Sequence, residues 1–219
     1  MYESLPVLTP PEARVLGVLV EKALSTPDAY PLTLRALVAG CNQTSNREPV
    51  VAYAPEEVEA AAALLCRRGL ASEQSSAHER AVKYRTTFGG AFDLAHGDKA
   101  VLAELLLRGP QPAGELRART VRMHAFASAD EVQAVLDGLA ARALPLVAAL
   151  PGRREPRWAH RLGGEMGASE APETGPGRSA TPVGVLADEV AALREENAAL
   201  RERLDALEAA FHGFRAAFE

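Results

Sequence analysis

The chain of 219 residues is poor in cysteine and has no long apolar run. Two isolated cysteines, Cys41 and Cys66, predict neither a disulfide framework nor a zinc site. No apolar run approaches the roughly 20 residues that a membrane-spanning helix needs. The first residues, Met1-Tyr2-Glu3-Ser4, lack the basic and apolar regions of a signal peptide. We therefore expect a cytoplasmic protein with no membrane partner.

The sequence also lacks the motifs that carry catalysis or bind a cofactor or a metal. Its five histidines are scattered, and none has the spacing of a metal-ligand pair. It contains no glycine-rich phosphate loop and no nucleophile elbow. Cys41 falls on an apolar helical stripe and Cys66 follows the apolar Leu65, so both are expected to pack as small hydrophobic residues. We therefore expect no enzyme, no catalytic residue, no cofactor and no metal site.

A basic surplus is missing too, although DNA-binding domains usually have one. The formal net charge is −5. Residues 1–90 hold nine Lys/Arg and ten Asp/Glu, residues 91–165 hold ten and nine, and residues 166–219 hold five and ten. The part before the acidic tail is therefore close to neutral, and any nucleic-acid-binding surface on it must be a local patch.

An internal repeat occupies the residues before position 163. Seven positions recur 74 residues later as identical or similar residues. They are Glu56, Glu57, Val58, Leu65, Arg68, Leu70 and Tyr84, matched by Asp130, Glu131, Val132, Leu139, Arg142, Leu144 and Trp158. Earlier in each copy the offset is larger, since Val15-Leu16 matches Val101-Leu102, and Leu34-Arg35-Ala36 matches Leu116-Arg117-Ala118. A longer loop in the first copy explains this change.

Each copy predicts the same order of elements: a helix, a short helix, a third helix and two strands. Thr9 and Glu12 form a capping box with Pro10 at the first helical position, which marks the start of the first helix. The strands are expected near residues 70–74 and 81–87, and near 144–150 and 157–162. We therefore predict a mainly α protein with small β-hairpins, made of two tandem winged-helix domains, residues 1–92 and 93–162.

A linker and a coiled coil are predicted to follow. Residues 163–182 lack periodicity and are rich in Gly, Pro, Ser and Ala, which is typical of a flexible linker. Residues 183–219 carry an unbroken heptad pattern with valine at a positions and leucine at d positions, which favours two parallel strands. Asn197 at a single a position is expected to fix their register. The expected dimer contacts are Val190, Leu193, Asn197, Leu200, Leu204 and Leu207. One expected partner is therefore the chain itself, in a parallel homodimer.

Three motifs resemble the YceH-like family of uncharacterised bacterial proteins. The first joins residues 27–34 (PDAYPLTL) to residues 41–50 (CNQTSNREPV), and the others lie at 107–117 and 152–160. The resemblance covers roughly residues 8 to 162, and it implies a tandem winged-helix fold without an established activity. Ala29 departs from the pattern, which has an aromatic residue in that place.

The polar segment after the second helix of the first copy is a candidate nucleic-acid contact. The candidate residues there are Asn42, Gln43, Ser45, Asn46 and Arg47. An arginine among amide and hydroxyl groups is typical of phosphate and base-edge contacts. In the alternative interpretation the segment is a polar cap, in which Arg47 pairs with Glu48 or with a helix C-terminus. The sequence leaves both interpretations open.

The two predicted hairpins supply the basic patches. Their candidate residues are Lys83 and Arg85 in the first hairpin, and Arg153, Arg154, Arg157 and Arg161 in the second. Such arginines neutralise phosphates and make binding sensitive to salt. Tyr84 and Trp158 occupy equivalent repeat positions and are therefore expected in the core. Both third helices begin with carboxylates, which oppose their insertion into a DNA groove.

Two functions from different classes remain open. A nucleic-acid-binding or transcription-regulator-like dimer is favoured by the basic second hairpin. A protein-interaction scaffold that binds another protein and no DNA is favoured by the neutral domains and the acidic third helices. The first rests mainly on analogy of fold.

Overall fold

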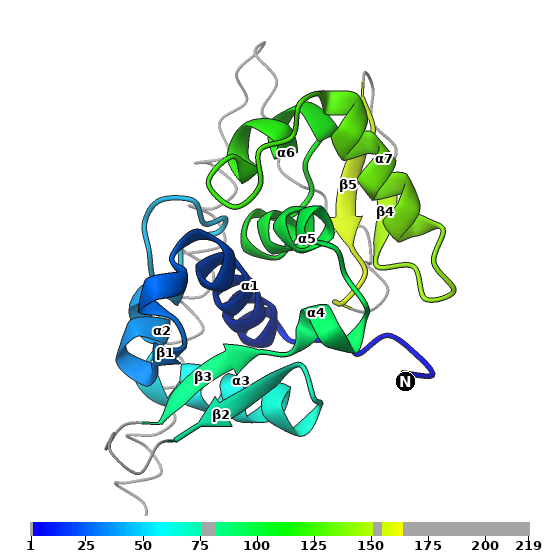
Figure 1. Cartoon of the computed structure of the whole chain (residues 1–219). Helices are drawn as coiled ribbons and strands as arrows, with labels where there is room; N and C mark the ends of the chain where they lie inside the picture. The colour runs from blue at the N-terminus through cyan, green and yellow to red at the C-terminus, as the bar shows by residue number, and fades with distance from the viewer. Residues whose placement is uncertain (1, 76–81, 151–154, 164–219) are drawn as a thin grey trace, which may run out of the picture. The chain divides into compact units, whose positions relative to one another are not determined.

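The computed structural model describes residues 2–75, 82–150 and 155–163 (Figure 1). This part of the chain is mainly helical, with two small antiparallel sheets. Residues 164–219 lie outside the described residues. The predicted linker, apart from Gly163, and the predicted coiled coil with all its dimer contacts fall in that segment, and they stay predictions.

The first repeat contains helices, a short strand and a hairpin in the expected order. Its elements are α1 (Pro10–Ser25), η1 (Pro27–Ala29), β1 (Leu32–Thr33), α2 (Leu34–Cys41), α3 (Pro55–Arg67), β2 (Ala71–Gln74) and β3 (Lys83–Thr86). The three strands form one antiparallel sheet in the order β1-β3-β2, in which Leu32 lies opposite Tyr84.

The second repeat follows a short connecting helix and has the same order. Its elements are α4 (Phe88–Ala91), α5 (His96–Arg108), α6 (Ala113–Thr120), α7 (Ala129–Ala140), β4 (Val147–Leu150) and β5 (Arg157–His160). Strands β4 and β5 pair antiparallel. An isolated bridge between Gln111 and Trp158 takes the place that β1 has in the first repeat.

The predicted capping box at the start of α1 is confirmed. The Thr9 backbone N–H donates to Glu12 Oε2 at 2.8 Å, and the Glu12 N–H donates to Thr9 Oγ1 at 3.4 Å. These reciprocal bonds satisfy two backbone donors that the first turn of a helix leaves free. Pro10 is the first residue of the helix, as the sequence predicts.

The structure confirms one offset of the repeat and corrects another. Leu65 and Leu139, which are 74 residues apart, are both buried in the third helices. The second helices are related differently, because Leu32 bridges to Tyr84 as Gln111 bridges to Trp158. Each second helix begins two residues after its bridged residue, so Leu37 corresponds to the equally buried Leu116. The prediction that Leu34 matches Leu116 is therefore wrong.

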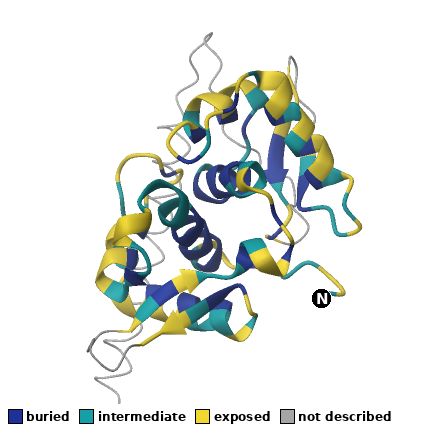
Figure 2. Ribbon diagram, viewed as in Figure 1, coloured by how far each residue is buried: buried dark blue, intermediate teal, exposed yellow. Residues whose placement is uncertain are grey.

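Helices α1 and α5 pack against each other in the middle of the unit (Figure 1). Helix α1 contacts α2, α3, β3 and α5, and it is buried along most of its length (Figure 2). A helix surrounded by other elements in this way has few exposed positions, and its buried residues include the charged Glu12 and Arg14. Gly17 permits the close approach, since a Cβ there would lie 2.9 Å from Leu107 Cδ2.

Candidate functional site

The Arg47 side chain lies inside the protein, where every N–H of its guanidinium has an acceptor. Its relative exposure is 3%. Nε donates to the Gly40 carbonyl at 3.0 Å, and Nη1 donates to the Asn46 carbonyl at 2.8 Å and to Glu21 Oε1 at 3.3 Å. Nη2 donates to Glu21 Oε2 at 2.6 Å and to Gln43 Oε1 at 2.7 Å. An arginine has five such donors, so none is left for a phosphate.

These contacts match the polar-cap interpretation of the segment, with one correction. Gly40 lies in the last turn of α2, so Arg47 binds a helix C-terminus as that interpretation predicts. The carboxylate partner is Glu21 of α1, and not the neighbouring Glu48, whose side chain is exposed. The reason is that Arg47 points inward to α1, while Glu48 donates its backbone N–H to the Leu107 carbonyl at 2.9 Å.

The other candidates of this segment also have internal roles. Asn42 donates to the Tyr53 carbonyl and accepts from the Tyr53 N–H, both at 2.9 Å, and so closes the loop on itself. Asn46 accepts from Arg108 of α5 at 3.3 Å and has a positive φ of 57°. Ser45 is exposed. Of the five candidates, Ser45 is therefore the one whose side chain has no bond to another described residue.

A second buried arginine, which the sequence does not single out, holds the same loop. Arg14 of α1 is 4% exposed and donates to the Cys41 carbonyl at 3.2 Å and to the Pro49 carbonyl at 2.6 Å. Burial, and then the nearby Arg47 charge, lowers the pKa of Arg14. Its signal in the sequence is a charge between the apolar residues Ala13 and Val15 on a helix.

The candidates on the hairpins lie nearer to solvent. Arg85 of β3 is exposed, and so are Arg157 and Arg161 at the two ends of β5. Lys83 is half-buried. Arg157 also donates to the Pro110 carbonyl through Nε at 3.1 Å and Nη2 at 2.5 Å. Arg153 and Arg154 belong to the connection between β4 and β5 and lie outside the described residues.

The aromatic residues beside these arginines belong to the core, as predicted. Tyr84 is 5% exposed and Trp158 is 6% exposed, so neither presents its ring to a nucleic-acid base. The carboxylates at the starts of the third helices lie on the surface. The exposed ones are Glu56, Glu57 and Glu59 on α3 and Asp130 and Glu131 on α7.

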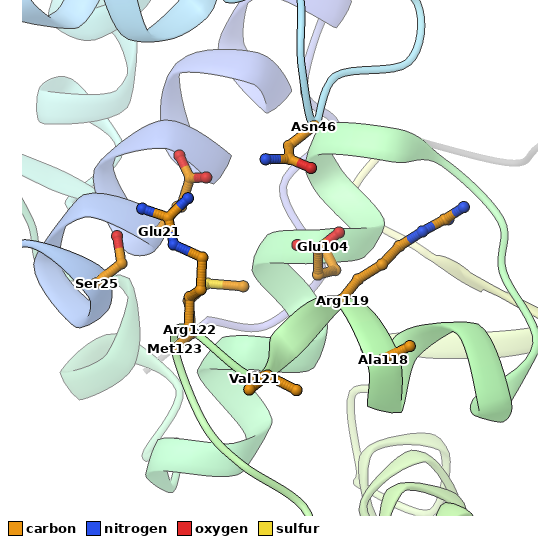
Figure 3. A pocket seen from close by; sticks show the side chains of 9 residues that line it. All are labelled: Glu21, Ser25, Asn46, Glu104, Ala118, Arg119, Val121, Arg122 and Met123. Atoms are coloured by element: carbon orange, nitrogen blue, oxygen red, sulfur yellow. The ribbon is translucent and has the colours of Figure 1, made fainter.

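A polar cavity that the sequence does not predict lies between the two repeats (Figure 3). Its volume is about 240 Å³. Three lining residues come from the first repeat and six from the second. They are Glu21, Ser25 and Asn46, and Glu104, Ala118, Arg119, Val121, Arg122 and Met123. The cavity therefore brings the Glu21 carboxylate of the first repeat together with one carboxylate and two guanidinium groups of the second.

Glu104 of α5 is the most unusual group of the cavity. It is 5% exposed, and its Oε2 has no hydrogen-bond partner among the described residues. Burial raises the pKa of Glu104 to about 7, although the charge of Arg108 opposes this rise. In the sequence its signal is a carboxylate between Ala103 and Leu105 in an otherwise apolar helix segment.

Among the described residues there is no sign of a reactive thiol, a metal site or a membrane-spanning helix. Burial raises the pKa of the Cys41 thiol to about 12, so almost no thiolate forms near neutral pH. Within residues 2–75, 82–150 and 155–163, no group of three His, Cys, Asp or Glu side chains is placed to hold a metal ion. The helices of these ranges include none that is long and apolar enough to cross a membrane.

Comparison with known proteins places this chain beside bacterial relatives. A family model described as "Protein of unknown function, DUF480" matches residues 8–157. A UPF0502 protein of Azoarcus sp. (strain BH72) is 50% identical over 169 residues, which are 76% of this chain and 75% of the relative. A UPF0502 protein of Opitutus terrae is 49% identical over 173 residues, 77% of this chain and 75% of the relative. A UPF0502 protein of Burkholderia pseudomallei (strain 668) is 47% identical over 182 residues, 82% of this chain and 77% of the relative.

Proposed function

We propose that this chain, which belongs to the DUF480 family of proteins of unknown function, is a nucleic-acid-binding or transcription-regulator-like dimer. The family membership confirms the resemblance to the YceH-like proteins. In the proposal each repeat is a winged-helix unit, residues 183–219 form the parallel coiled coil, and the protein has no catalytic activity. The order of three helices and a hairpin in each repeat supports the winged-helix assignment.

The exposed arginines of the hairpins are the observation that carries this proposal. Arg85 and Arg157 stand on the strands β3 and β5, which the buried Tyr84 and Trp158 anchor to the core, and Arg161 follows the end of β5. Arginine side chains on a fixed strand suit the contacts that position a protein on a phosphate backbone. Arg47 has no part in the proposed surface, because its guanidinium is fully bonded inside the protein.

The proposed binding is independent of base sequence and weakens with salt. The helices α3 and α7 stand in the recognition position of a winged helix, yet their first turns expose carboxylates. These groups repel the phosphates on both sides of a groove, so the hairpins are left to make the contacts. In the proposed dimer the coiled coil joins two chains and a flexible linker connects it to the repeats, which raises the effective concentration of the second copy at a long target.

Fluorescence anisotropy with a random duplex, at stepped salt concentrations, tests this function. We expect binding at low ionic strength that falls as salt rises, and a loss of at least about tenfold in affinity when Arg153, Arg154 and Arg157 are all changed to Ala. The control is Arg67→Ala, an exposed arginine at the end of α3. Equal binding by the triple variant, or no binding of the full chain at low salt, contradicts the proposal.

A protein-interaction scaffold without DNA binding is the second candidate function. The exposed carboxylates that begin α3 and α7 favour it, because they suit a basic protein surface better than a nucleic acid. Light scattering, which reports the oligomeric state, and the anisotropy measurement together distinguish the scaffold from the nucleic-acid-binding protein. A dimer that binds no duplex supports the scaffold, and a chain truncated after Leu162 is expected to be monomeric in either case. A truncated chain that stays dimeric contradicts the coiled-coil assignment.

A further inference from the structure

Two charged residues that line the cavity between the repeats, Glu104 and Arg119, stand at positions that are apolar in the first repeat. Val18 of α1 packs on Gly40 of α2 so closely that a Cβ at Gly40 would lie 2.7 Å from Val18 Cγ1. The offsets of 86 and 79 residues, taken from the first and second helices, place Glu104 and Arg119 at these two positions. A valine on a glycine leaves no space, whereas Glu104 and Arg119 line an open cavity of about 240 Å³.

Two of the charged groups in the cavity already have partners. Glu21 accepts from Arg47 and lies 3.5 Å from Lys22 Nζ. Arg119 pairs with Glu115 at 2.9 Å, and the same Nη1 donates to Gln111 Oε1. These bonds hold the Glu21 and Arg119 side chains on the cavity wall, and the neighbouring opposite charges partly neutralise them.

One acidic and one basic group remain available. Glu104 Oε2 has no partner among the described residues although it is buried. The exposed Arg122 forms no hydrogen bond or ion pair with any other residue that the structure describes. Figure 3 shows Glu104 in the middle of the lining residues, with the Arg122 guanidinium on the side of Glu21. A buried acceptor without a donor costs free energy unless a ligand supplies that donor.

We propose that this cavity binds a small zwitterion of amino-acid size, with its ammonium group on the Glu104 carboxylate and its carboxylate on the Arg122 guanidinium. The volume equals that of roughly eight water molecules at about 30 Å³ each, which suits an amino acid and is small for a nucleotide. Ser25 and Asn46 add polar groups to the wall. The inference goes beyond nucleic-acid binding, because the cavity shares no residue with the hairpins.

The site predicts a dependence of affinity on pH. The groups that act on Glu104 are Arg108 on its own helix, Glu21 of α1, Arg119 of α6 and Arg47 of the loop. Because the pKa of Glu104 is raised to about 7, an ammonium ligand must displace a proton below that pH. We therefore expect the affinity to fall as the pH drops below about 7, while the ammonium of the ligand stays charged.

Titration of the full chain with L-alanine, L-serine and L-leucine tests the site, followed by calorimetry and by amide NMR shifts. N-acetyl-L-alanine lacks the ammonium and L-alanine amide lacks the carboxylate, so they are matched probes. We expect at least one of the three zwitterions to bind at least about tenfold tighter than either blocked form. No binding of any of the three up to about 10 mM, or equal binding of the blocked forms, overturns the proposal.

Two variants locate the binding. Glu104→Gln keeps the shape of the side chain and removes its charge, and Arg122→Gln changes an exposed residue that the fold does not need. Each is expected to lower the affinity at least about tenfold, and Glu104→Gln is also expected to abolish the dependence on pH. Arg35→Gln, an exposed arginine of α2 outside the cavity, is the control and should bind as the unchanged chain does. Unchanged binding by Arg122→Gln places the zwitterion elsewhere and contradicts the proposal.

Discussion

The loop after the second helix differs between the two repeats. In the first repeat it runs from the end of α2 at Cys41 to Pro55, and Arg47 within it reaches Glu21 of α1. The corresponding connection of the second repeat, between Thr120 and Ala129, is shorter. The longer loop also contacts the other repeat, through the bond of the Glu48 N–H to the Leu107 carbonyl.

The second and third helices, by contrast, each keep a buried leucine at the same position in both repeats. Leu37 and Leu116, like Leu65 and Leu139, are almost completely buried. The repeats thus share these buried apolar positions, and they differ in the polar residues at the contact between them. Substitutions of Arg47, Glu104 and Gly17 should therefore show how much of the unfolding free energy comes from the contacts between the repeats and how much from the core that they share.

The largest effect is expected from Arg47→Ala. The change leaves the Glu21 carboxylate, whose side chain is 13% exposed, without its main partner, and it removes the bond to the Gly40 carbonyl. Loss of one partner of a buried ion pair costs about 3 to 5 kcal/mol of unfolding free energy. Urea denaturation measures it, with Arg35→Ala on the exposed face of α2 as the control. If Arg47→Ala lowers the unfolding free energy no more than the control does, the bonds of Arg47 contribute little to stability.

The next effect in size is expected from Glu104→Gln without ligand. The folded protein holds the Glu104 proton up to a pKa of about 7, against 4.5 for an unburied carboxyl. Ionisation of Glu104 therefore lowers stability progressively as the pH rises from 4.5 through 7. The glutamine variant avoids this cost, so it should be more stable than the parent by about 3 kcal/mol at about pH 8.5 and by little at about pH 4.5.

Urea titrations of the unchanged chain and of Glu104→Gln at several pH values give the difference between their unfolding free energies. The half-buried His160, whose pKa burial lowers to about 4, has the opposite effect and destabilises the fold as the pH falls through 6.5. Because His160 is present in the parent and in the variant, its contribution cancels in the difference. A difference that does not change with pH would show that Glu104 does not titrate in this range.

A smaller effect is expected from Gly17→Ala at the contact of α1 with α5. The new Cβ would lie 2.9 Å from two atoms of Leu107, so the Leu107 side chain or the helices must shift. Such overpacking costs about 1 to 3 kcal/mol, which outweighs the usual gain of alanine in a helix. The matched control is Gly138→Ala in α7, where no atom lies within 4 Å of the added Cβ. Thermal denaturation should show the control to be stabilised by about 0.5 to 1 kcal/mol and Gly17→Ala to be destabilised.

The elements of the fold follow from local signals, and the site does not. Thr9 and Glu12 mark the start of α1 because a capping box involves residues three apart. The sequence alone does not decide the role of Arg47, since this role depends on Glu21, which lies 26 residues away on α1. The cavity escaped prediction because it depends on how the two repeats pack. The correct offset of the second helices, which relates Glu104 and Arg119 to an apolar pair, required the bridge at Gln111.

The shared packing of α1 and α5 also determines how the protein unfolds. Val15, Leu16 and Leu19 of α1 and Leu105 of α5 are completely buried, and the two helices cover each other. If one repeat opened alone, it would expose leucine and valine side chains of the other, at a cost of about 1.5 to 3 kcal/mol for each side chain. We therefore expect the two repeats to melt in one cooperative transition, and amide protons at the centres of both helices to exchange only through global unfolding.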